Sequence, residues 1–326
     1  MKLKKVTTLS LAIALCLSSM AVGCGKKLTP KEKLLAATEA SSDIKSIDAT
    51  YSMNINTPDG EFAKITGDMI FSEFMKNGKI TQNMSLGGMS IEQTVYMKDE
   101  KSYSSLPMSD KFIVSENSGS MPFDEASMKQ LQAQMLEKVK TLLDESEVTE
   151  VKEDGLNKLT WTLTDEQTTA YFTETINAVF TDEFFATIKE EAAVGMKTQL
   201  EAMGQQPSEE EINKMVEEQT QQTIELIKSV FTDSKFSNFT STYYVDDKNN
   251  IKKADMSLTV DLADSLKQML ATLGLNVPVL TLDISVVYNS LNETVNVDFS
   301  ELTEENTITM EDYAAQMGNV ATTPAA

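Results

Sequence analysis

Alternation of apolar and polar side chains dominates residues 47–115, and short breaks rich in glycine, proline and asparagine interrupt it. Successive side chains of a strand point to opposite faces, so this period of two predicts strands with one buried and one solvated face. The breaks match the tight turns of β-hairpins, which indicates an antiparallel meander. They are Pro58-Asp59-Gly60, Asn77-Gly78 and Gly87-Gly88, and the expected strands are 47–55, 62–74, 79–86, 89–98, 102–107 and 111–115.

Helical spacing takes over in four other segments. A capping box at Thr29-Pro30-Lys31-Glu32 predicts a helix from residue 30 to about Ser46. Apolar side chains three and four positions apart predict a second helix at 123–144, and residues 165–232 form an acidic, glutamine-rich helical block. A short helix at 261–273 completes the set.

Three further hairpins are expected beyond the meander. Two strands flank Asp154-Gly155, and strands at 236–246 and 251–260 meet across a polar turn. A last hairpin pairs 279–289 with 293–299. The apolar side chains of its second strand are Val295, Val297 and Phe299.

The order of these elements predicts the fold class. Helices that alternate with hairpins must pack on one face of one sheet, because each apolar face needs an apolar partner. We therefore expect an α+β fold, in which a single curved antiparallel sheet of about ten or eleven strands forms a half-open barrel covered by helices. The folded domain spans 30–315, with a helical insertion at 165–232, and the small-residue tail 316–326 is expected to be disordered.

The first 23 residues have the parts of a secretory signal peptide. Lys2, Lys4 and Lys5 form a positive start, and an uncharged apolar stretch from Val6 to Val22 follows. This stretch is short for a membrane-spanning helix, which needs about 20 apolar residues. An uncleaved anchor is the second interpretation.

Ala21-Val22-Gly23-Cys24 resembles the lipobox of bacterial lipoproteins. That family prefers leucine at the first position of the box, whereas the large aliphatic residue of this chain, Val22, comes one position later. The resemblance implies cleavage before Cys24, acyl chains such as palmitate on the new N-terminus, and anchoring to the extracytoplasmic face of the cell membrane through residues 24–29. Cys16 lies in the discarded segment, so the mature chain cannot form an internal disulfide. The alternative is an ordinary cleavable signal with two chance cysteines.

Composition excludes several function classes. The chain holds no histidine and no arginine, and its formal net charge is −22. Without imidazole there is no histidine-based catalytic triad and no histidine ligand for zinc. The negative charge repels phosphate backbones, so we expect no nucleic-acid partner. We interpret the charge as a solvated acidic coat, with a docking face for a cationic partner as the alternative.

Three short patterns have a chemical interpretation and a simpler structural one. Ser42-Asp43-Ile44-Lys45 has the Ser-x-x-Lys spacing of serine acyl enzymes but lacks their other elements. Residues 246–250 resemble a calcium loop without its glycine and closing glutamate, and a hairpin turn explains them. Glu209-Glu210-Glu211 lies in the first turn of a helix, where negative charge is favourable. We therefore expect no catalytic residue, no metal and no cofactor.

A leading helix, a meander and helices between later hairpins, behind a lipobox, are similar to the lipoprotein-carrier group. That group includes the LolA-type carriers and the mycobacterial LppX and LprG lipoproteins. The resemblance covers about residues 30–300 and implies an apolar barrel interior that holds acyl chains beneath a helical lid; the block at 165–232 is larger than that lid. Methionine is abundant and adapts to irregular apolar shapes, although it also fills ordinary cores. The side chains expected to line a ligand site are Met84, Met89, Met97, Met128, Met135, Trp161, Leu282, Ile284 and Val286.

Two hypotheses for function follow. In the first, a non-catalytic lipoprotein, held at the membrane by its covalent lipid, binds or carries a lipid or other apolar ligand. In the second, a protein-interaction or chaperone-like lipoprotein uses the acidic helical block 165–230 to hold a protein partner. A hydrolase that uses carboxylates is a distant third.

Overall fold

Twelve strands form one sheet, in the order β12-β6-β5-β4-β3-β2-β1-β11-β10-β9-β8-β7. The computed structural model describes residues 28–309 except 41–43, 74–75, 100, 107–108, 117–124, 201–207, 249, 273 and scattered positions between 182 and 199, and also describes 312–313. Neighbouring strands are antiparallel except β12 and β6, which are parallel. Within this part of the chain, no helix is both long enough and apolar enough to cross a bilayer.

The strands follow the predicted alternation closely. They are β1 (Ile47–Thr57), β2 (Gly60–Glu73), β3 (Asn77–Leu86), β4 (Met89–Lys98), β5 (Lys101–Ser105), β6 (Phe112–Glu116), β7 (Glu147–Glu153), β8 (Leu156–Thr162), β9 (Lys235–Val245), β10 (Ile251–Asp261), β11 (Val279–Leu291) and β12 (Thr307–Thr309). The helices that bear on the site are α2 (Pro30–Ala40), α3 (Glu125–Glu145), α4 (Asp165–Val179), α6 (Glu209–Asp233) and α7 (Asp264–Thr272).

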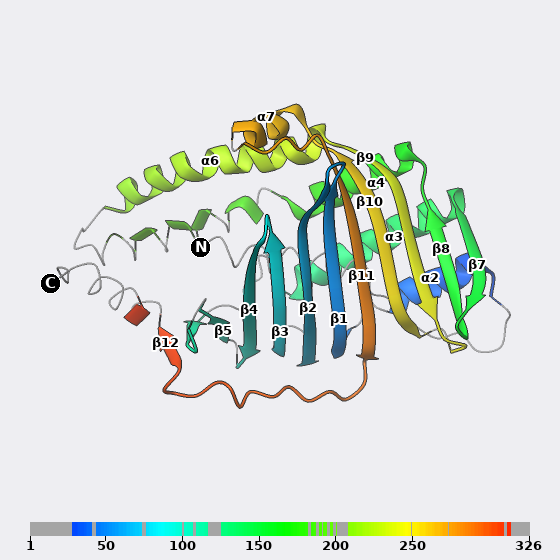
Figure 1. Cartoon of the computed structure of the whole chain (residues 1–326), viewed down its shortest axis with the longest axis horizontal. Helices are drawn as coiled ribbons and strands as arrows, with labels where there is room; N and C mark the ends of the chain where they lie inside the picture. The colour runs from blue at the N-terminus through cyan, green and yellow to red at the C-terminus, as the bar shows by residue number, and fades with distance from the viewer. Residues whose placement is uncertain are drawn as a thin grey trace.

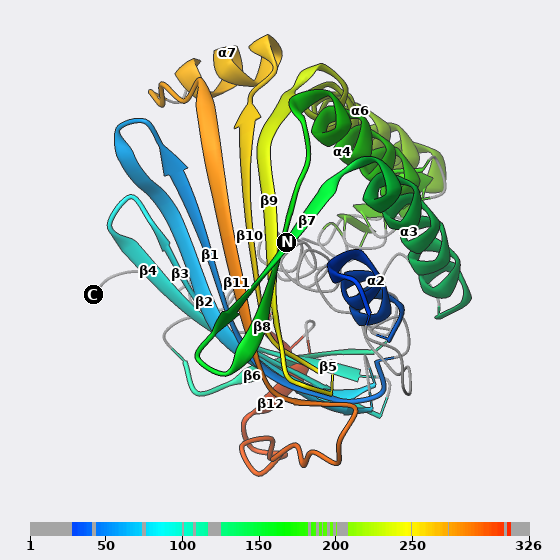
Figure 2. The same cartoon turned by 90° about the vertical axis from the view of Figure 1, so that its right-hand side faces the viewer.

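The sheet is curved and open; α2, α3, α4 and α6 lie on its concave side, and α7 lies at the ends of the strands (Figures 1 and 2). Helix α4 packs on β9, α2 packs on β7 and α3, and α6 packs on α4 and α7. The expected single curved sheet covered by helices is confirmed in this form. The barrel does not close, because β12 and β7 remain at the two ends of the sheet.

The centre of the sheet joins two segments that lie far apart in the sequence. Strand β1 pairs with β2 on one side and with β11 on the other, from Ile47 opposite Leu291 to Asn56 opposite Thr281. Strand β11 pairs in turn with β10. The first hairpin and the last long strand therefore form the middle of the sheet, and the meander β1–β6 and the strands β7–β10 form its two wings.

One predicted element boundary and one predicted strand are wrong. Helix α2 ends at Ala40, and residues 44–46 are not helical. Residues 293–299 form no strand, so the last predicted hairpin does not exist. The reason is that both hydrogen-bonding edges of β11 are already taken by β1 and β10.

Residues 292–306, which we call the strap, instead run along the sheet to β12 (Figure 1). The ring of Phe299 lies 6.0 Å from the ring of Tyr96, on the convex side of β4. Glu301 Oε1 forms an ion pair with Lys79 Nζ at 3.0 Å. The backbone nitrogen of Phe112 donates to the carbonyl of Asn306 at 2.7 Å, and β12 then pairs with β6. The strap therefore covers Tyr96, which is fully buried.

An aromatic cluster fixes α4 to the sheet. The ring of Trp161 on β8 meets the ring of Phe239 on β9 edge-on at 5.4 Å, and Tyr171 of α4 packs against both. Trp161 Nε1 donates to Ser146 Oγ at 2.6 Å. The first helix of the acidic block is thus part of the hydrophobic core rather than a free arm.

Candidate functional site

The concave face of the sheet carries four rows of side chains that run across the strands. We call them the concave rows. The strand register defines them, because directly opposed residues lie on one face. Row one is Leu258–Leu282–Ile55–Ala63–Leu86–Met89, row two is Trp161–Ser241–Met256–Ile284–Met53–Ile65–Met84–Ile91, row three is Leu159–Tyr243–Ala254–Val286–Tyr51–Gly67–Gln82–Gln93, and row four is Tyr288–Ala49–Met69–Ile80–Val95–Ser104.

No member of the concave rows is charged. Most are aliphatic or methionine, and the polar ones carry only hydroxyl or carboxamide groups. Row three continues onto β7 at Glu150, opposite Leu159. There the carboxylate pairs with Lys33 of α2, so its charge is neutralised locally. The concave rows therefore form a wide surface that suits uncharged, mainly apolar groups.

Three buried polar side chains lie together in row three. Tyr51 Oη donates to Gln82 Oε1 at 3.2 Å, and Gln82 Nε2 donates to Gln93 Oε1 at 3.0 Å. Burial raises the pKa of Tyr51 well above its ordinary value, and the negative charge of Asp68 adds to this effect. The phenol is therefore neutral at physiological pH, and the two carboxamides carry no charge at any such pH.

Ser241 is a fourth buried polar residue, in row two. It is 1% exposed and lies between Trp161 and Met256 in the register. Its Oγ has no hydrogen-bond partner in the described part of the chain. Buried hydroxyls are nearly always hydrogen-bonded, so this exception calls for an explanation.

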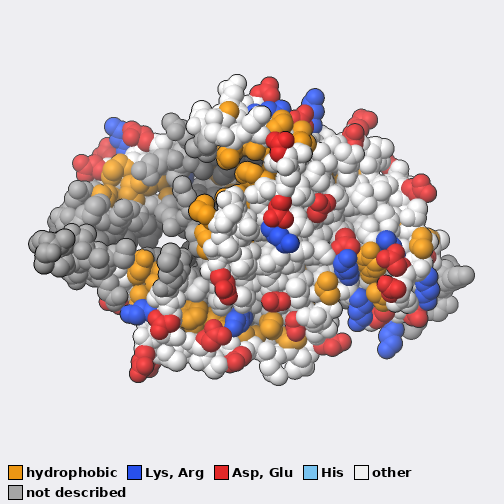
Figure 3. All heavy atoms as spheres, viewed as in Figure 1, with side chains coloured by type: hydrophobic (Ala, Val, Ile, Leu, Met, Phe, Trp, Pro, Cys, Tyr) orange, Lys and Arg blue, Asp and Glu red, His pale blue; other side chains and the backbone are white. Residues whose placement is uncertain are grey.

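The concave rows become more exposed toward the turn between β3 and β4. Ile284 and Val286 in the middle of the sheet are buried, whereas Leu86, Met89 and Ile91 are 47%, 68% and 38% exposed. Figure 3 shows hydrophobic side chains gathered between α7 and the nearby ends of the strands. Large exposed apolar side chains in a group indicate an interaction or ligand surface.

Six of the nine side chains predicted to line a ligand site lie in the concave rows: Met84, Met89, Trp161, Leu282, Ile284 and Val286. Met97 lies one row further along, opposite Gly78, and Met135 of α3 packs against the core. The side chain of Met128 is outside the described residues, as are Ala21, Val22, Gly23 and Cys24. The structure thus brings most of the predicted set onto one face.

The sequence prediction missed Ser241, Gln82, Gln93 and Gly67. A signal for them was present, because Gln82 has the same parity in its strand as Ile80 and Met84. A polar residue at an apolar position of an alternating strand points into the core. What the pattern does not contain is the register that sets these residues beside one another.

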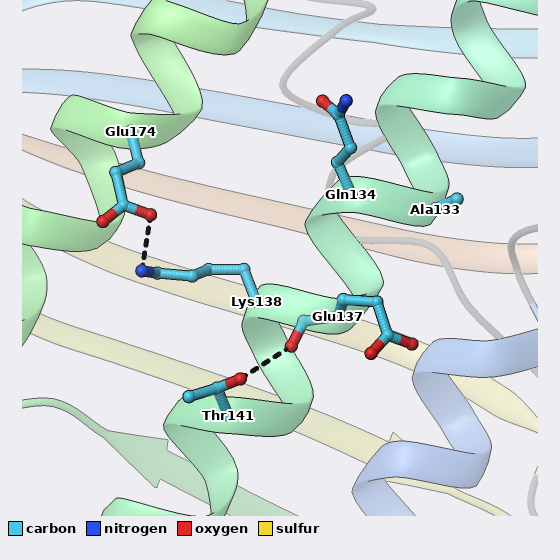
Figure 4. A pocket seen from close by; sticks show the side chains of 6 residues that line it. All are labelled: Ala133, Gln134, Glu137, Lys138, Thr141 and Glu174. Atoms are coloured by element: carbon cyan, nitrogen blue, oxygen red, sulfur yellow. Dashed lines mark hydrogen bonds and ion pairs between the residues drawn. The ribbon is translucent and has the colours of Figure 1, made fainter.

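A hollow of about 550 Å³ lies elsewhere, between α3 and α4 on the outside of the helical layer. Figure 4 shows that Lys138 of α3 reaches across it to form an ion pair with Glu174 of α4, while Thr141 donates to the carbonyl of Glu137. Ala133, Gln134 and Thr141 also line this hollow, which is held between the two helices and lies away from the concave rows.

A second hollow, of about 240 Å³, lies on the opposite, polar face of the central strands. Its two carboxylates are Asp255 and Asp283. Each accepts a hydrogen bond of 2.7 Å from a serine, from Ser285 and Ser257 respectively. These contacts are the cross-strand pairs of a solvated sheet face, so they account for the carboxylates without a catalytic role.

The other sequence motifs have structural explanations. Asp246 Oδ1 accepts from the backbone nitrogens of Lys248 and Asn250 at 2.8 Å, which closes the turn between β9 and β10. Burial alone would raise the pKa of Asp246, but hydrogen bonds from Asn250 and Lys248 lower it below its ordinary value. Glu211 forms the capping box of α6 with Ser208. Ser42 lies outside the described residues, and those that are described contain no cluster of three potential metal ligands.

Comparison with known proteins gives little further guidance. No family model matches the chain, and no curated protein sequence matches it. Among solved structures, a LolA superfamily protein from Nitrosomonas europaea matches 80% of this chain and 91% of its own, with 8% sequence identity and a TM-score of 0.22. This superposition is too poor to place the chain in that superfamily.

Proposed function

We propose that this protein is a non-catalytic lipoprotein, anchored by Cys24 to the extracytoplasmic face of the membrane, that binds a lipid or other apolar ligand on the concave rows. The observation that supports ligand binding is the uncharged apolar face, which is buried under helices at one end and exposed at Leu86, Met89 and Ile91 at the other. The anchoring rests on the lipobox at residues 21–24.

Physical chemistry favours an acyl chain as the occupant. Each methylene group removed from water contributes about 0.8 kcal/mol, so a long chain gains several kcal/mol from apolar contact alone. Methionines at positions 53, 84 and 256 alternate with branched side chains along row two. Their flexible thioethers can adapt to the shape of a chain.

The binding experiment uses the chain that begins at Gly25, which keeps every described residue. We expect native mass spectrometry of detergent-free protein to detect a co-purified apolar molecule, and an uncharged pyrene-labelled alkyl probe to bind. Ile91→Glu should weaken probe binding at least five-fold, because it places a charge among the exposed members of the concave rows. Ser90→Glu, one residue away on the opposite face, is the matched control. Equal affinity in both variants, or no binding by the unmodified protein, would refute the proposal.

The anchoring experiment is separate. Cells fed labelled palmitate should incorporate it into the unmodified protein and into Cys16→Ala, but not into Cys24→Ala. Cys24→Ala should also lose membrane attachment, because its covalent lipid is gone. Incorporation that persists in Cys24→Ala would refute anchoring and leave the binding proposal intact.

A further inference from the structure

We infer that the ligand enters the concave rows as an uncharged acyl ester, and that Ser241 Oγ donates a hydrogen bond to its carbonyl oxygen. This inference rests on the proposed function and goes further by naming the ligand's chemical class and a specificity-determining residue. Two independent observations carry it: the hydroxyl of Ser241 and the absence of charge in the concave rows.

Ser241 has the position that such a role requires. It is 1% exposed, it lies on the same face as the apolar side chains of row two, and no described group bonds to its Oγ. An apolar side chain would satisfy packing at this position without a buried hydroxyl. The hydroxyl can donate to a carbonyl oxygen, which brings an acceptor without a charge.

The uncharged character of the rows selects against other lipid classes. A free fatty acid or a phospholipid headgroup on this face would need a cationic partner, because an isolated buried charge is very unfavourable. The concave rows offer none, and Lys33 beyond their edge is already paired with Glu150. An ester loses little on leaving water if its carbonyl accepts one hydrogen bond.

Row two gives the rest of the molecule a continuous, mainly apolar row of side chains. From Ser241 it continues through Met256, Ile284 and Met53 to the exposed Ile91 on β4. Six strand spacings of about 4.8 Å give a path of about 29 Å. One membrane leaflet is about 15 Å of hydrocarbon, so the row is longer than an acyl chain that spans one leaflet.

The test compares three pyrene probes of equal chain length: decylpyrene, pyrenedecanoate and pyrenedecanoic acid methyl ester. Binding to the chain from Gly25 is measured at pH 8 by energy transfer from Trp161, the only tryptophan, which lies opposite Ser241. We expect the ester to bind at least ten-fold more tightly than the carboxylate. Ser241→Ala should weaken ester binding about five-fold, as for the loss of one hydrogen bond, and leave decylpyrene unchanged. Ser237→Ala on the same strand should change neither.

A second measurement separates ligand recognition from structural support. Without ligand, Ser241→Ala should have a melting temperature equal to or above that of the unmodified protein, because it removes a buried hydroxyl that has no partner among the described residues. A lower melting temperature, an equal loss of affinity for ester and alkane, or carboxylate binding as tight as ester binding would overturn this inference alone. Failure of all three probes to bind would overturn the proposed function as well.

Discussion

Tyr51 Oη reaches across β2 and donates to Gln82 Oε1 at 3.2 Å. The residue between them in the register is Gly67, and a Cβ built there would lie 2.9 Å from Tyr51 Oη and 2.1 Å from the carbonyl oxygen of Thr81. The hydrogen bond therefore depends on the absence of a side chain at residue 67. Glycine inside a strand usually weakens it, and here the close approach provides the compensation.

Gly67→Ala should destabilise the protein by about 2–4 kcal/mol, because the added methyl group forces the backbone of β3 or the ring of Tyr51 to move. Urea unfolding followed by circular dichroism would measure this difference. The control is Thr66→Ala, on the opposite face of the same strand, for which we expect a smaller change. Equal stability of the two variants would show that the space at residue 67 is not tight.

Tyr51→Phe should change the response of stability to alkaline pH. The pKa of Tyr51 is raised in the folded protein, so its stabilising effect is complete below about pH 10, where the unfolded phenol begins to ionise, and decreases above it. The unmodified protein should lose up to about 1.4 kcal/mol per pH unit more than Tyr51→Phe above pH 10. At pH 8 the variant should be about 1 kcal/mol less stable, owing to the lost hydrogen bond. Parallel stability curves from pH 8 to 11 would contradict this assignment.

Ser146→Ala should leave the indole nitrogen of Trp161 without its acceptor in a buried environment. We expect a loss of about 1–3 kcal/mol in unfolding free energy. Because Trp161 is the only tryptophan, its emission spectrum should change in the same variant. Thr149→Ala on β7 is exposed and serves as the control. An unchanged spectrum would argue against this hydrogen bond.

Phe299→Ala should loosen the strap from the sheet. The ring of Phe299 covers Tyr96, and Lys98 Nζ lies 5.3 Å from the centre of the Phe299 ring. We expect a loss of about 1–3 kcal/mol and faster amide hydrogen exchange in β5 and β6, with β1 and β11 unaffected. Asn296→Ala, at an exposed position of the strap, should leave exchange unchanged. Uniform acceleration across the sheet would mean that the strap is not a separate stabilising unit.

The sequence predicted the strands well and their neighbours less well. Alternation and turn residues together indicated every strand from β1 to β11, because half-buried strands carry a period of two and hairpins need tight turns. Alternation also suggested a strand at 293–299, where Val295 and Val297 alternate with polar residues. Alternation reports which side of a segment is apolar, but it does not report whether a partner edge is free. Alternation therefore could not predict the pairing of β1 with β11 or the parallel contact of β12 with β6.

The candidate site, too, was predicted in part, because the sequence shows the apolar character of a residue but not its neighbours in space. Met84 and Leu282 were predicted from apolar character and hairpin placement, and both lie in the concave rows. Ser241 could not be recognised, since a serine in a strand looks the same whether its hydroxyl is solvated or buried. Its importance depends on the absence of a hydrogen-bond partner in the part of the chain that the structure describes, which only three-dimensional placement establishes.

The pairing of β1 with β11 also has a consequence for how the chain folds. Residues 47–57 can pair with residues 279–291 only once the latter have been made. The middle of the sheet therefore forms only after nearly the whole chain has been synthesised. Such distant pairing slows folding. If the chain is exported as its first 23 residues predict, this delay would keep it unfolded while it passes through a translocation channel. Folding would then begin on the extracytoplasmic side of the membrane.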